Sequence, residues 1–223
     1  MTYFLNSPII SWLPVIFFGL LLLLGFSSYV ARGSEETGSL RKNSKKMIWA
    51  AVAFYIIYPI LLTMGQYYAW LMGGSFSKIL LNSPLDEKVP IPQFIKELPL
   101  LQSHLGYFVF YSFGRFWINS ILAVGAAFLF YLFLKFLQKR KDRFFEEGEL
   151  ELGFLCALVV GWPKFVIFVP LIFLLVVVIS LVRLFIWKER YTALGYPFIA
   201  AALASLIFGA GLVSLLNLSV LNI

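Results

Sequence analysis

The chain of 223 residues contains one cysteine, Cys156, and one histidine, His104. A single cysteine cannot form an intramolecular disulfide, and one cysteine with one histidine cannot supply the ligands of a zinc site. A nucleophilic dyad of cysteine or serine with histidine is poorly supported for the same reason. Phosphate-binding loops and dinucleotide-binding glycine patterns are also missing from the sequence. We therefore expect neither a metal nor a cofactor.

Charged side chains are also scarce, at 13% of the chain, whereas 61% of the residues are hydrophobic and the mean hydropathy is +0.89. Soluble domains carry about 25% charged residues. The apolar runs are long and continuous, which excludes transmembrane strands with their short alternating segments. This composition predicts an all-α, polytopic membrane helix bundle whose main partner is the lipid bilayer.

The net charge of +7 does not indicate a nucleic-acid partner. The cations lie in short connections between apolar runs, where they orient a membrane protein and meet anionic lipid headgroups. The basic connections 32–46, 138–149 and 188–194 are therefore predicted to face the cytoplasm. We expect a cytoplasmic membrane of the prokaryotic type.

The apolar runs predict a single integral membrane domain over residues 1–223, with about six transmembrane helices. The predicted spans are residues 9–30, 47–72, 117–137, 150–162, 163–187 and 195–218. The fourth is short for a crossing. It is predicted to cross nonetheless, because basic segments follow both the third and the fifth span and place these ends on the same side. Both termini are then outside.

The longest polar connection, residues 73–116, is predicted to lie outside, because its lysines only match its acidic residues in number. Its four prolines exclude one continuous helix. We expect short helices lying on the membrane surface, with the aromatic-rich segment 98–116 at the level of the headgroups.

Four glutamates stand just before the fourth span: Glu146, Glu147, Glu149 and Glu151. One interpretation is a solvated cap, in which they interact with the positive end of the helix dipole and pair with the basic run 139–143. The other is an intramembrane carboxylate site, because carboxylates at this depth are costly to dehydrate.

The segment from Gly148 to Trp162 resembles the second active-site motif of the type IV prepilin peptidases, which are membrane aspartic endopeptidases. That family reads G-x-G-D-x-K-L, followed by a helix of small residues that ends in G-W. Here Gly148, Glu149 and Leu152 match the motif positions, and Gly161-Trp162 falls at the family spacing. A second match lies at the last span, where Gly195, Pro197 and Phe198 resemble the family's G-P-F-L-A segment. The resemblance covers about a third of the chain.

This resemblance implies an aspartic-type endopeptidase of the cytoplasmic membrane that acts on prepilin-like signal segments. Glu149 occupies the position of the second catalytic aspartate. Aspartic proteolysis needs a second carboxylate close enough to share a proton, and Glu35 and Glu36 are the candidates after the first span. The motif departs from the family, since the aspartate is a glutamate and the lysine is Glu151. The resemblance therefore implies a site that is degenerate at its catalytic positions.

A different class of function stays open. Ala201, Ser205 and Gly209 recur every four residues and predict a small-residue stripe on which another helix packs closely. A non-catalytic membrane scaffold or assembly subunit would bind partner helices in this way. A small transporter is the weakest alternative, because almost no charge lies deep within the spans.

Overall fold

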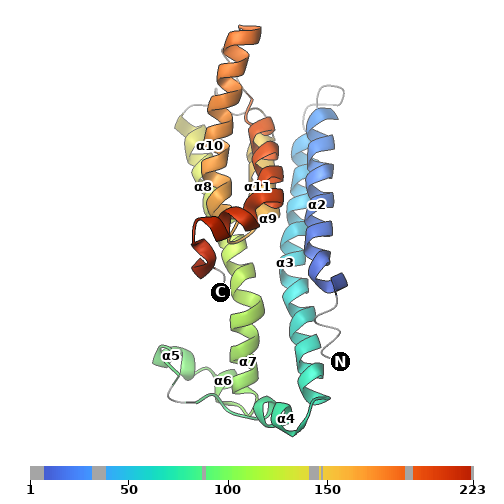
Figure 1. Ribbon diagram of the computed structural model, residues 1–223, viewed down its shortest axis with the longest axis vertical. Coiled ribbons are helices and arrows are strands. Elements are labelled where there is room, and N and C mark those ends of the chain that lie inside the picture. Colours follow the sequence, from blue (N-terminus) through green and yellow to red (C-terminus); the bar gives the residue numbers. More distant parts are fainter. Residues whose placement is uncertain are drawn as a thin grey trace. The chain divides into compact units, whose positions relative to one another are not determined.

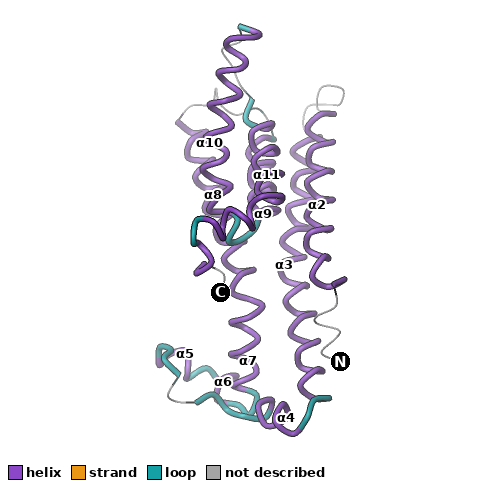
Figure 2. Tube along the Cα trace, in the orientation of Figure 1, coloured by secondary structure: helices purple, strands orange, loops and turns teal. Residues whose placement is uncertain are grey.

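The computed structural model describes residues 8–31, 39–86, 89–140, 146, 148–188 and 193–221, and all secondary structure in these ranges is helical (Figures 1 and 2). The predicted all-α class is confirmed. Five helical stretches of the described chain are long and apolar enough to cross a membrane, so the chain is an integral membrane protein. They are Trp12–Val30, Arg41–Leu71, Gly106–Arg140, Phe165–Ile186 and Gly195–Leu215.

The chain divides into two compact units, one of residues 1–13, 56–120 and 223 and the other of residues 14–55 and 121–222. Three long helices run through both: α2 (Pro8–Val30), α3 (Ser39–Leu71) and α8 (Ile118–Arg140). The remaining helices of the first unit are short: α4 (Ser75–Leu81), α5 (Gln93–Lys96), α6 (Pro99–Gln102) and α7 (Gly106–Ser112).

Aromatic rings join the C-terminal half of α3 to α7 in the first unit. The Trp70 ring lies 5.4 Å from the Phe108 ring and 5.1 Å from the Tyr111 ring. That the helices between residues 73 and 116 lie on the membrane surface stays a prediction. The prediction that they are short is correct for α4, α5 and α6. It is wrong for α7, which continues into α8 through a π-helical turn, Phe113–Trp117. The reason is that residues 106–117 contain no proline to interrupt the helix.

The second unit is built around α9 (Glu149–Val160), in which eleven of the twelve residues are buried. Around it lie α2 (Pro8–Val30), the N-terminal half of α3, α8, α10 (Phe165–Val182) and α11 (Gly195–Leu215). The core contains Phe168 and Phe198, which are 0% and 1% exposed. A helix that is apolar on all sides belongs in the centre of such a bundle.

Helix α9 starts at the same end of the unit as α11 and runs parallel to it. Glu149 contacts Gly195 at the start of α11, while Lys164, just before α10, lies against Gly209. Helix α10 therefore returns antiparallel to α11. Twelve residues extend about 18 Å, which is short of the hydrocarbon thickness of about 30 Å. A sixth full-length span, as predicted for residues 150–162, is thus not seen. Helix α9 instead connects α8 to α10 along the chain.

The small-residue stripe on α11 is already covered by the chain itself. Ala201, Ser205 and Gly209 are all buried within the second unit, where α11 packs against α9 and α10. Close helix packing at small residues is as expected. The expectation that this stripe receives a partner helix is not met, because no free surface remains there.

Adding a methyl group to Gly153 should destabilise the second unit. A Cβ on Gly153 would lie 2.8 Å from the Leu134 Cδ1 atom and 3.0 Å from the Phe198 ring. We expect Gly153→Ala to lower the free energy of unfolding by about 1–3 kcal/mol, the usual range for an overpacked core. Thermal unfolding in detergent micelles would measure it.

Gly125→Ala on α8 is the matched control, because nothing lies within 4 Å of its Cβ position. This variant should be unchanged or more stable by about 0.5–1 kcal/mol, since alanine favours a helix over glycine. Equal destabilisation by the two variants would contradict the packing described.

Candidate functional site

A glycine turn places Glu149 at the start of α9. Gly148 has a φ of 83°, a left-handed conformation that glycine adopts without steric cost. The Glu149 amide donates to the Glu146 carbonyl at 3.2 Å across this turn. The Glu149 side chain does not cap its own helix. It points into the bundle instead, where it is 0% exposed.

Four hydrogen-bond donors surround the Glu149 carboxylate. Its Oε1 atom accepts from the Tyr29 hydroxyl at 3.1 Å and from the Gly195 amide at 2.9 Å. Its Oε2 atom accepts from the Glu146 amide at 3.1 Å and from the Leu194 amide at 3.3 Å. Both oxygens are thus held by two donors each, and the side chain is shielded from solvent.

The carboxylate takes the place of an N-terminal cap for α11. The Leu194 and Gly195 amides stand at the beginning of that helix, where amide groups lack partners within the helix and the dipole favours an anion. Glu149 therefore links the start of α9 to the start of α11, and through Tyr29 to the end of α2.

Burial raises the pKa of Glu149 above its ordinary value of 4.5, and a nearby Glu146 charge adds to the rise. The hydrogen bonds from the Glu146 and Gly195 amides and from Tyr29 oppose it. The site also accommodates the neutral form of Glu149. The hydroxyl of the protonated carboxyl group can donate to the Tyr29 oxygen, and a lone pair of the same hydroxyl can still accept from the Gly195 amide. The site can therefore hold a proton between Glu149 and Tyr29.

Glu151 makes the second polar link of this region. Its Oε1 atom lies 2.9 Å from the Arg41 Nε atom near the start of α3. The Arg41 side chain is 54% exposed, so this ion pair contributes only about 0–1 kcal/mol. The ion pair orients the Arg41 and Glu151 side chains but adds little to the stability of the fold.

The remaining motif residues have packing or turn roles. Gly161 ends α9 with a φ of 65°, and the Tyr55 hydroxyl lies against it while donating to the Leu158 carbonyl at 2.8 Å. The Trp162 indole donates to the Leu221 carbonyl at 2.8 Å. Three motif side chains belong to the buried interior: Leu152, Pro197 and Phe198.

Gly195 allows Tyr29 to reach the carboxylate. A Cβ at this position would collide with the Cε2, Cζ and hydroxyl atoms of the Tyr29 ring. The glycine of the predicted second motif is therefore required by the Tyr29 contact. Tyr29 itself is only 4% exposed, so it belongs to the interior of the bundle.

The solvated-cap interpretation is wrong for Glu149, which is buried, and Glu151 pairs with Arg41. The partner candidates Glu35 and Glu36 lie outside the described residues. Sequence reasoning missed Tyr29 and Arg41. The signal for Tyr29 was a phenolic hydroxyl at the end of an apolar run, which needs a hydrogen-bond partner when buried.

Within the part of the chain that the structure describes, no three His, Cys, Asp or Glu side chains come together as a metal site would require. Comparisons with known protein families, with characterised proteins and with solved structures found no match to this chain.

Glu149→Gln should destabilise the protein although it keeps the side-chain shape. One of the two oxygens becomes an NH₂ group, which cannot accept from the surrounding amides and leaves at least one buried donor without a partner. Such a group costs about 1–3 kcal/mol. Thermal unfolding in detergent would measure the loss. Glu151→Gln is the control, with an expected change of less than about 1 kcal/mol.

The stability difference between the wild type and Glu149→Gln should depend on pH. The folded-state pKa is raised above 4.5, so the unfolded chain releases this proton first as the pH increases. The contribution of Glu149 to the stability of the folded protein is fully present below pH 4.5 and is lost as the pH rises through the folded-state pKa of Glu149. The wild-type advantage should therefore shrink from acidic to neutral pH, as unfolding curves of both proteins would show. An advantage that grows over this range would refute the assignment.

Proposed function

We propose that this chain is a non-cleaving relative of the prepilin peptidases, acting as a membrane subunit that binds apolar, signal-like segments of partner proteins. The observation that carries the proposal is the state of Glu149. Its side chain is fully buried, and its two oxygens accept from four donors.

Aspartic proteolysis needs a water molecule held between two carboxylates, one acting as base and the other as acid. Glu149 has no exposed surface on which such a water could sit. Among the described residues, the carboxylate whose charge affects it is Glu146, three residues earlier in the same segment. Two carboxylates so close in the chain do not enclose a water from opposite sides. This arrangement supports a structural role for the position of the family's aspartate.

The binding half of the proposal rests on the resemblance of the motif region and on the membrane architecture. Because the stripe on α11 is covered, a partner segment would contact the apolar faces that remain exposed. On α10 these include Leu174, Val177 and Leu181, which are 57%, 58% and 49% exposed. Such faces also contact lipid, so a partner helix would replace lipid there.

A peptidase is the second candidate, favoured by the matching spacing from Gly148 and Glu149 to Gly161 and Trp162. A cleavage assay with a prepilin-like peptide in membranes separates the two. We expect no cleavage by the wild type, Glu149→Gln or Glu149→Asp, because no catalytic water reaches this carboxylate. Cleavage by the wild type that is lost in Glu149→Gln would overturn the proposal. Cleavage gained in Glu149→Asp would reveal a latent site.

The same reconstituted protein should bind the peptide without cutting it. Fluorescence transfer between a labelled peptide and labelled protein in lipid vesicles would measure the association. The control peptide carries two aspartates in its apolar segment, which should prevent insertion, since each costs about 2.5–3.5 kcal/mol at the centre of a membrane helix. Equal signals from both peptides, or none from either, would refute the binding role.

A further inference from the structure

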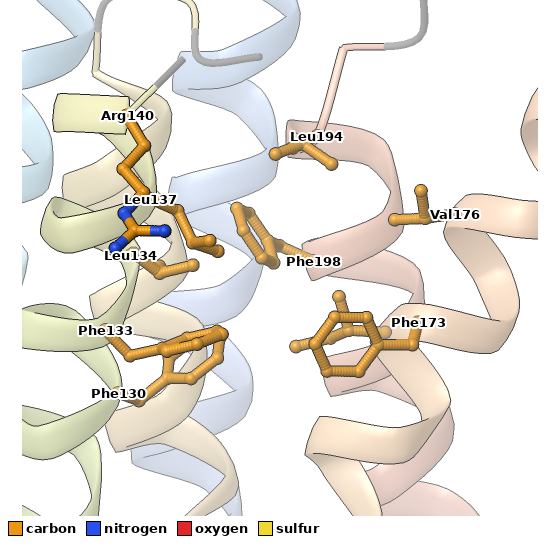
Figure 3. A pocket seen from close by; sticks show the side chains of 10 residues that line it. Phe130, Phe133, Leu134, Leu137, Arg140, Phe173, Val176, Leu194 and Phe198 are labelled. Carbon is orange, nitrogen blue, oxygen red and sulfur yellow. The ribbon is translucent and has the colours of Figure 1, made fainter. Parts of the chain in front are cut away.

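A pocket of about 510 Å³ opens between α8, α10 and α11 in the second unit (Figure 3). Nine of its ten lining residues are apolar, and the tenth is Arg140 at the end of α8. Its volume lies within the range of about 300–1,000 Å³ that is usual for small-molecule sites. The lining residues are Phe130, Phe133, Leu134, Leu137, Arg140, Ile172, Phe173, Val176, Leu194 and Phe198. We call it the acyl groove.

The dimensions of the acyl groove match one leaflet of a bilayer. Its α8 wall extends over the eleven residues from Phe130 to Arg140, a rise of about 15 Å along the helix axis. This is half of the hydrocarbon thickness of about 30 Å. All three helices that form it are membrane-spanning in length and composition, and Arg140 is the last residue of its span. The groove thus begins at headgroup level and extends into the apolar layer.

Arg140 is positioned over the groove. Its guanidinium lies 4.8 Å from the centre of the Phe136 ring, and Figure 3 shows its side chain directed along the α8 wall toward Leu134 and Leu137. Among the residues that the structure describes, no carboxylate pairs with Arg140. Within the described ranges, Arg140 is thus a cation with no carboxylate partner, and it lies at the edge of the apolar groove.

We propose that the acyl groove is a binding site for an anionic phospholipid, with one acyl chain in the groove and the phosphate on Arg140. A guanidinium binds phosphate oxygens through two parallel hydrogen bonds, which gives a defined geometry as well as charge attraction. At the same time, the acyl chain of the lipid buries apolar surface against Phe130, Phe173 and Phe198. The ligand thus matches the groove in length, polarity and charge.

A transmembrane helix fits the same groove less well. A helix with its side chains is about 10–12 Å in diameter, and an apolar helix carries no phosphate for the Arg140 guanidinium at the edge of the groove. An unbranched acyl chain is thinner and enters without separating α8 from α10. This inference does not rest on the proposed function, because it concerns a lipid and not a protein segment.

Native mass spectrometry of the detergent-purified protein, titrated with phosphatidylglycerol or phosphatidylcholine, tests the site. We expect one phosphatidylglycerol to bind more tightly than phosphatidylcholine. Arg140→Gln should weaken phosphatidylglycerol binding about tenfold, equivalent to about 1.4 kcal/mol. The control is Lys139→Gln, which removes the same charge one residue away, outside the groove lining, and should leave binding little changed.

Val176→Trp tests the groove itself, because the larger side chain should fill it. Val176 is only partly buried, so the variant should fold, which its thermal unfolding would verify. Loss of the tightly bound phosphatidylglycerol is the expected result. Unchanged binding in folded Val176→Trp, or equal weakening by Arg140→Gln and Lys139→Gln, would overturn the site. Displacement of the lipid by the prepilin-like peptide would also overturn it, in favour of a protein segment as the occupant.

Discussion

A carboxylate removed from water must find hydrogen-bond donors within the protein, and this requirement organises the second unit. Glu149 has no exposed surface and accepts from Tyr29 and from the amides of Glu146, Leu194 and Gly195. Those donors come from the end of α2, the turn before α9 and the start of α11. Because leaving any of them without a partner is costly in a buried site, the three segments are held at one end of the bundle. The short, apolar α9 is thereby fixed in its centre.

The glycines of the two motifs serve this arrangement. Gly148 turns the chain into α9 with a left-handed conformation, and Gly195 leaves room for the ring that contacts the carboxylate. A sequence motif that resembles a catalytic centre can thus be read as a packing device. The same glycines that would position a reactive acid here position a buried, fully hydrogen-bonded one. A resemblance in motif spacing therefore predicts the local backbone conformation more reliably than it predicts the chemistry of the site.

The sequence was sufficient to predict the helical membrane class and five of the long helices, because continuous apolar runs leave few alternatives in lipid. It was insufficient for α7, which was expected on the membrane surface but continues into α8. The site was found only in part. The position of Glu149 followed from motif spacing, but its burial did not, because four donors from residues 29, 146, 194 and 195 cannot be paired with it without the tertiary structure. The Arg41–Glu151 contact across 110 positions was invisible for the same reason.

The parallel course of α9 and α11 has a consequence for biosynthesis. Two of the donors that satisfy Glu149 are 45 and 46 residues further along the chain. While α9 is being inserted these amides have not yet been made, so the acid remains hydrated or protonated at the membrane surface. A twelve-residue helix is also too short to anchor itself in the bilayer. The hydrogen-bonded environment of Glu149 is therefore complete only after the start of α11 has been synthesised.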